Sequence, residues 1–282
     1  MNPTNQMTPP NEKSSTTPPK TRDIELSVEL DASPEDVFRA VTDGTEIAKW
    51  LAPEARVTPP TEGKKGTIFV SWGEGMGVEK PIEIWDAPRR MRHASSENPE
   101  TKAPLWVDWL VEAKAGGTTT LRLVHSGFST GADWDEEFES HERGWRLMLA
   151  NLRHYFTRHA KKPAVHLPFM MKLDSSRQDV WSALLAKLAF QAAPKAGDAF
   201  RITAAPADVL TGTIDLVNPA RDLGLVVHEL DDGLLRFTLE GGAKPAGPTF
   251  LFGYVIAFGD AANTDPAREL ASKMASLVQQ LG

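Results

Sequence analysis

The first clear pattern begins at Ile24, where apolar residues alternate with polar or charged ones as far as Leu30. Such alternation is typical of a β-strand with one buried face. Ser33 and Pro34 follow, a helix N-cap and a proline at the first helical position, and Asp36 completes a short capping box. The pattern therefore predicts a strand that leads directly into an amphipathic helix.

The pattern then changes to a short helix, a run of strands and a long helix. The short helix is expected from Thr45 to Leu51, and it carries Trp50. Further strands are expected at about 66–72, 78–85, 91–95, 105–113 and 118–125. From Trp134 to His159, apolar and aromatic residues recur every three or four positions. This order predicts an α+β domain, a curved antiparallel sheet wrapped around a long last helix with a cavity between them.

The chain also repeats itself. Residues 30–41 align with 173–184, with six of the twelve positions identical, and 82–91 align with 214–223 in the same order. The second unit is 11 residues shorter between the two matches, and it lacks the stretch around Trp50. A period this long indicates duplicated domains. We therefore expect two tandem α+β domains, 23–162 and a shorter, degenerate 163–282, after a proline-rich disordered tail at 1–22.

Several residues carry a resemblance to a known family. They are the stretch 28–38, Trp50, the turn 86–90, the stretch 125–128 and the pair Gly144–Trp145. Together they resemble the START-like (SRPBCC) superfamily, in the branch similar to the C-terminal domain of the heat-shock protein 90 ATPase activator. The resemblance covers about 22–160 well, and it reaches 165–282 only through the repeat. It implies that both units are helix-grip (START/Bet v-like) domains. It also implies a hydrophobic pocket between the sheet and the last helix, which different members use for lipids, polyketides, hormones or protein contacts.

Composition narrows the class of protein. The hydrophobic fraction of 41% and charged fraction of 24% are typical of a soluble globular protein. A net charge of -7 argues against a nucleic-acid partner. Cysteine is absent, and no apolar stretch is long enough to span a membrane. We expect a cytoplasmic protein without a membrane span.

Seven aromatic residues of the first unit are the candidates for a ligand cavity. They are Trp50, Trp72, His93, Trp109, His125, His141 and Trp145. Strand alternation and helical spacing place the three histidines on apolar faces, where they could offer hydrogen bonds or protons to a ligand. The alternative is structural: buried histidines bonded to backbone carbonyls, and tryptophans that fill a core.

No other chemistry is expected. No histidine pair has the spacing of a zinc helix, and the acidic residues between Asp133 and Glu139 suit the positive end of a helix dipole. We therefore expect no metal site, no cofactor and no defined catalytic residues.

Three functions remain open on these grounds. The first is binding of a small apolar molecule or lipid in the cavity of the first domain. The second is a cyclase- or aromatase-like enzyme that uses the cavity histidines, and it requires one of them to lie beside an acid in accessible space. The third is a co-chaperone or protein-interaction module, which rests only on the name of the resembling branch.

Overall fold

The computed structural model describes residues 20–98, 102–205, 208–241 and 247–281. The predicted disordered tail falls mostly outside this range. The first strand, however, begins at Thr21, earlier than the alternation from Ile24 indicated.

The first domain has the predicted order of elements. Its sheet consists of β1 (Thr21–Leu30), β2 (Glu54–Thr58), β3 (Thr67–Ser71), β4 (Val78–Asp86), β5 (Arg90–Glu97), β6 (Pro104–Ala113) and β7 (Thr119–Ser129). Its helices are α1 (Pro34–Thr42), α2 (Gly44–Ile47), η1 (Ala132–Trp134), α3 (Asp135–His154) and the π-helical turn η2 (Tyr155–His159). The strands run antiparallel in the order β1-β7-β6-β5-β4-β3-β2.

The second domain repeats this plan with fewer elements. Its strands are β8 (Ala164–Leu173), β9 (Ala199–Ala205), β10 (Asp208–Asn218), β11 (Asp222–Val227), β12 (Gly233–Gly241) and β13 (Thr249–Phe258). Its helices are α4 (Arg177–Lys187), η3 (His228–Leu230), η4 (Gly259–Asn263) and α5 (Asp265–Gln279). The order β8-β13-β12-β11-β10-β9 matches the first sheet without a partner for β2. The fold is thus α+β, with two tandem helix-grip domains.

The helix starts agree with the sequence in both domains. The Ser33 hydroxyl accepts a hydrogen bond from the Asp36 amide at 3.1 Å, and Ser176 accepts one from Asp179 at 3.2 Å. The short second helix is shorter than predicted, because α2 ends at Ile47. Trp50 lies in the following turn, where its indole N–H donates to the Ala40 carbonyl at 3.0 Å.

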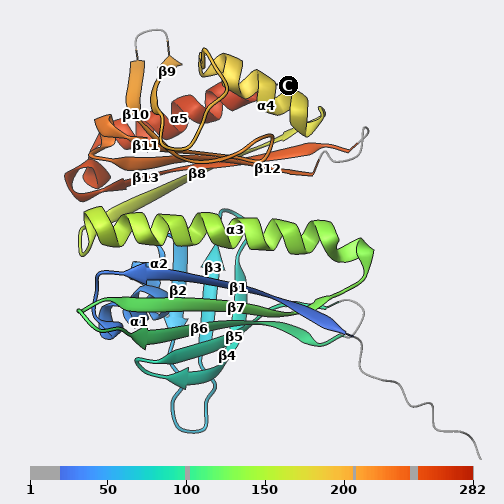
Figure 1. The fold of residues 1–282 in the computed structure, drawn as a ribbon, viewed down its shortest axis with the longest axis vertical. Coiled ribbons are helices and arrows are strands. Elements are labelled where there is room, and N and C mark those ends of the chain that lie inside the picture. The colour runs from blue at the N-terminus through green and yellow to red at the C-terminus, as the bar shows by residue number, and fades with distance from the viewer. Residues whose placement is uncertain (1–19, 99–101, 206–207, 242–246, 282) are drawn as a thin grey trace, which may run out of the picture.

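Helix α3 lies between the two sheets (Figure 1). Leu149, Leu152 and Tyr155 face the first sheet and belong to its core. The same apolar core continues into the second domain, through residues that include Leu234 and Ile256. The helix of the first domain therefore packs against the second sheet as well.

The second sheet is buried on both faces as a result. On β12, Leu235, Phe237 and Leu239 pack in the core shared with α4 and α5. Leu234 and Arg236, which alternate with them along the strand, belong to the opposite face and contact the first domain. Strands buried on both sides carry near-continuous apolar runs, which explains the uncharged stretch from Phe250 to Gly259.

Candidate functional site

An apolar pocket of about 590 Å³ lies between α3 and the second sheet. The first domain contributes Trp72, which follows β3, and His141 and Trp145 on α3. The second domain contributes residues of β8, β12 and β13. The pocket is therefore completed only when both domains are present.

A glycine widens the pocket on its α3 side. Gly144 lies between His141 and Met148, all three lining the pocket. No atom lies within 4 Å of the position where a Cβ at Gly144 would stand. Any side chain at this position would therefore extend into open space.

The opposite wall follows from strand alternation. On β8, Val165, Leu167 and Phe169 turn to the core of the second domain, so His166, Pro168 and Met170 turn to the pocket. Antiparallel pairing sets Met170 opposite Phe252 and Pro168 opposite Tyr254. Met170 is 55% exposed, so the pocket opens to solvent beside it.

His166 is the unusual polar group of this wall. The residue is 7% exposed, and its ring packs on that of Tyr254 with 4.6 Å between centroids. Both ring nitrogens are shielded from solvent, and a backbone group of Ala48, in the first domain, favours the charged form of the ring. Burial dominates and lowers the pKa of His166 to about 3. The ring is therefore neutral at physiological pH.

A cluster of aromatic rings packs against the pocket residues of α3 from the side of the first sheet. His141 donates through Nδ1 to the Glu137 carbonyl at 2.9 Å, and its ring lies 5.2 Å from that of His125. The Trp145 indole donates to Nδ1 of His125 at 3.0 Å. Burial, with smaller contributions from the neighbouring histidines, lowers the pKa of His125 to about 3. These contacts hold His141 and Trp145 in place at the pocket.

A buried ionic network closes the pocket where α3 meets β12. Glu240 lines the pocket and pairs with Arg143 and, at 3.4 Å, with Arg221. Arg143, 8% exposed, also pairs with Asp222 at 2.5 Å. The Glu240 carboxylate is therefore already neutralised by protein groups.

Three of the seven predicted candidates, Trp72, His141 and Trp145, thus line the pocket. Trp50 and Trp109 instead pack edge to face in the first domain's core, with centroids 6.0 Å apart. His125 lies beneath the pocket, 1% exposed. His93 bonds through Nδ1 to the Ala94 carbonyl at 2.8 Å, and burial lowers its pKa.

The pocket is displaced from the position that the family resemblance implied. Between the first sheet and α3, the space is packed with Trp50, Met91, Trp109 and Leu152, each at most 2% exposed. The second-domain wall, which includes His166, Phe252 and Tyr254, was not among the predicted candidates. The signal was present in the apolar stretch from Phe250 to Gly259, which has no polar alternation and therefore indicates a second covered face.

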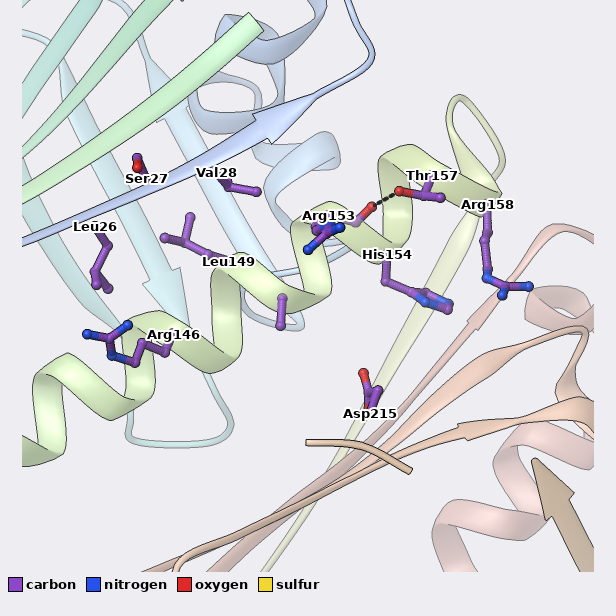
Figure 2. Close-up of a pocket in the computed structure, with 11 residues that line it drawn as sticks. Leu26, Ser27, Val28, Arg146, Leu149, Arg153, His154, Thr157, Arg158 and Asp215 are labelled. Atoms are coloured by element: carbon purple, nitrogen blue, oxygen red, sulfur yellow. Dashed lines mark hydrogen bonds between the residues drawn. The ribbon is translucent and has the colours of Figure 1, made fainter. Parts of the chain in front are cut away.

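A second cleft, of about 480 Å³, lies on another side of α3 (Figure 2). It is bounded by Leu26 to Val28 of β1, by α3 and η2, and by Asp215 of the second sheet. Its charged groups are mostly paired within the protein. Arg146 pairs with Glu142, Arg158 with Asp232, and Asp215 with Arg236. The cleft therefore leaves few charged groups unpaired for a ligand, and the apolar pocket is the better candidate site.

Within the described ranges, no group of three or more histidine, aspartate or glutamate side chains is arranged to hold a metal ion. Nor does any described helix have the length and apolar character needed to cross a membrane.

The fold is that of a two-domain protein of the helix-grip class. Residues 31–157 match the family described as activator of Hsp90 ATPase homolog 1-like protein, which confirms the resemblance for the first domain. No curated protein sequence matches the chain.

Solved structures are similar at low identity. The di-domain ARO/CYC BexL from the BE-7585A biosynthetic pathway is 14% identical, with 92% of this chain and 94% of that one covered and a TM-score of 0.41. DynU16, from the dynemicin biosynthetic locus, is 15% identical, with 92% and 95% covered and a TM-score of 0.41. The Aha1 dimer protein from Colwellia psychrerythraea is 19% identical, with 48% and 96% covered and a TM-score of 0.39.

Proposed function

We propose that this protein binds a small, mainly apolar molecule in the pocket between α3 and the second sheet. The observation that carries the proposal is the pocket itself, with a volume of about 590 Å³ and aromatic residues on both walls. Pockets of this size and character are typical small-molecule sites. Trp72, His141 and Trp145 would contact the ligand from the first domain.

Gly144 allows a sharp test of this proposal. Gly144→Leu places a branched side chain in the pocket without meeting other atoms at its Cβ, and leucine favours a helix more than glycine does. Gly144→Ala is the matched control, since it gives the same helical benefit but fills little of the pocket. Neither variant should be less stable than the parent protein. The expected gain in the free energy of unfolding is roughly 0.5–1 kcal/mol.

The measurement is binding of an uncharged apolar probe, hexylbenzene, followed by quenching of tryptophan fluorescence and by calorimetry. The parent protein and Gly144→Ala should bind it, and Gly144→Leu should not. Equal binding by all three proteins, or none by the parent, would contradict the proposal.

A second candidate function is enzymatic, and His141 favours it. Among the three predicted histidines, His141 lines the pocket and has an acid beside it, with Nδ1 3.4 Å from a carboxylate oxygen of Glu137. In the neutral ring, Nδ1 donates to the Glu137 carbonyl, so Nε2 is free to accept a proton. Turnover of a bound cyclisable substrate that His141→Gln abolishes, with binding retained, would support catalysis. Unchanged turnover in that variant would rule out this role.

The third candidate is a protein-interaction role, which the description of the matching family supports. Its test is co-purification of the full chain with a chaperone of the Hsp90 class. Absence of enrichment over a beads-only control would count against it.

A further inference from the structure

The second cleft, shown in Figure 2, carries arginines from one helix and its continuation. Arg146 and Arg153 lie on α3, and Arg158 lies on η2, which follows it directly. Among the described residues that line the cleft, the acidic one is Asp215, and both terminal nitrogens of Arg236 hold its carboxylate, at 2.5 and 2.7 Å. The cleft therefore has an excess of positive charge, in a chain whose net charge is -7.

Arg153 is the arginine of this group without an acidic partner in the described part of the chain. The Thr157 hydroxyl bonds to its backbone carbonyl at 2.8 Å, and its exposed guanidinium group is left free. Arg146 contacts Glu142 through one nitrogen, at 2.6 Å, in an exposed pair. Because a guanidinium group has five N–H donors and an exposed pair is weak, both arginines keep donors for an anion.

The two arginines lie on the same side of α3. They are seven residues apart, which is two helical turns and about 10 Å along the helix axis. Ala150 lies between them and also lines the cleft. Its small side chain leaves the space above the helix open, so both guanidinium groups can approach one anionic group from opposite ends.

The rest of the floor of the cleft is apolar. Leu26 and Val28 of β1 line it together with Leu149 of α3, and all three pack in the core of the first domain. An aromatic ring or short alkyl chain placed here would shield apolar surface from water, which is favourable. The volume of about 480 Å³ suits a small organic molecule.

We propose that this cleft is a second binding site, for a small organic anion whose carboxylate or phosphate group lies between Arg146 and Arg153. Planar guanidinium groups bind both kinds of anion through paired hydrogen bonds. The apolar part of the ligand lies on Leu26 and Val28. The site is independent of the proposed function, since the apolar pocket has no lysine or arginine among the described residues of its lining and takes a different class of ligand.

Three probes test the proposal on the full chain, by calorimetric titration at low salt and roughly neutral pH. They are phenyl phosphate, inorganic phosphate and benzyl alcohol. Phenyl phosphate should bind most tightly, inorganic phosphate more weakly because it lacks an apolar part, and benzyl alcohol not measurably at the same concentrations. Added sodium chloride should weaken the binding of phenyl phosphate, since salt screens exposed charges.

Arg153→Gln then identifies the group responsible. It should weaken the binding of phenyl phosphate about tenfold, the effect of losing hydrogen bonds to a charged group. Arg153→Lys keeps the charge without the planar fork, so its affinity should lie between the two. Arg268→Gln is the matched control, because Arg268 is also exposed on a helix, α5, has no acidic partner in the described ranges, and lies outside the cleft.

Gly144→Leu separates this site from the apolar pocket. It should leave the binding of phenyl phosphate unchanged, and Arg153→Gln should leave the binding of hexylbenzene unchanged. Loss of phenyl phosphate binding in Gly144→Leu would place the anion in the apolar pocket and overturn the proposal.

Three other results would also overturn it, with no bearing on the apolar pocket. The first is no binding of phenyl phosphate by the parent protein, and the second is equal weakening by Arg153→Gln and Arg268→Gln. The third is equal binding of phenyl phosphate and inorganic phosphate, which would show that the apolar floor contacts no ligand.

Discussion

The indole N–H of Trp145, on α3, donates a 3.0 Å hydrogen bond to Nδ1 of His125, on β7. Because Nδ1 accepts this bond, the neutral His125 ring carries its proton on Nε2. Nε2 has no hydrogen-bond partner in the described part of the chain. The rings of Phe128 and His141 pack against the His125 ring, with centroids 4.6 and 5.2 Å from its own. This pair therefore joins the sheet to the helix that carries the pocket wall.

Trp145→Phe should lower the free energy of unfolding by roughly 2–4 kcal/mol. The substitution leaves the buried Nδ1 of His125 without a donor and removes part of a large side chain. Urea denaturation, followed by far-UV circular dichroism, measures the effect.

Trp134→Phe is the control for this substitution. The indole N–H of Trp134 makes no hydrogen bond among the described residues, and its ring is only partly buried. Its effect should be less than half that of Trp145→Phe. Equal effects would show that the bond to His125 contributes little.

Buried neutral histidines should make the protein sensitive to mild acid. Burial lowers the pKa of His125 and His166 to about 3 and that of His154 to about 4. In the unfolded chain each titrates near its usual value of about 6.5, so below that pH the unfolded state binds protons that the folded state does not. Above this pH, these histidines cost the folded state no stability. Below it, each one lowers the free energy of unfolding by about 1.4 kcal/mol per pH unit until the pH reaches its folded pKa.

Urea denaturation at a series of pH values between about 7 and 4 tests this slope. His166→Phe removes one of these groups, so the stability of this variant should fall less steeply with pH than that of the parent protein. A variant with the parent's slope would show that His166 is protonated in the folded protein.

The fold was predictable because its signals are local. Alternation from Ile24 to Leu30, the Ser33 cap and the repeat at Ser176 each depend on neighbouring residues. The structure follows them in both domains, apart from the short α2 and the unpredicted β2.

The interdomain pocket was not predictable from the same signals. The α3 residues that face the second sheet include Arg143, Asn151 and His154, and such residues suggest a solvent-facing side when the helix is considered alone. Each is matched by a polar group far along the chain, and sequence spacing carries no information about such partners. The candidate tryptophans were ambiguous for a related reason, because an aromatic side chain fits a core and a pocket wall equally well.

Arg143→Met should destabilise the protein by about 3–5 kcal/mol. It leaves Asp222, 1% exposed, without its charged partner, and it also removes the pair with Glu240. Arg146→Met is the matched control on the same helix, since Arg146 is exposed and pairs with Glu142 one turn away. That surface pair should be worth less than about 1 kcal/mol. Similar losses in the two variants would show that the buried network does not stabilise the domain contact.

Asn151, fully buried, links the two domains through three hydrogen bonds. Its amide donates to the Trp50 carbonyl at 3.2 Å and to the Tyr254 hydroxyl at 2.8 Å, while its oxygen accepts from Nε of Arg236 at 3.0 Å. Asn151→Leu has nearly the same volume but leaves three buried groups without this partner, including an arginine that is 0% exposed.

We expect Asn151→Leu to lower the free energy of unfolding by at least about 3 kcal/mol, because each orphaned buried group costs roughly 1–3 kcal/mol. The loss should fall on the contact between the domains, so unfolding should separate into two transitions, seen by calorimetry. Asn263→Leu, at an exposed position, should stay within about 0.5 kcal/mol of the parent. A single transition with little loss for Asn151→Leu would mean that apolar packing alone, through residues such as Leu234 and Ile256, holds α3 to the second sheet.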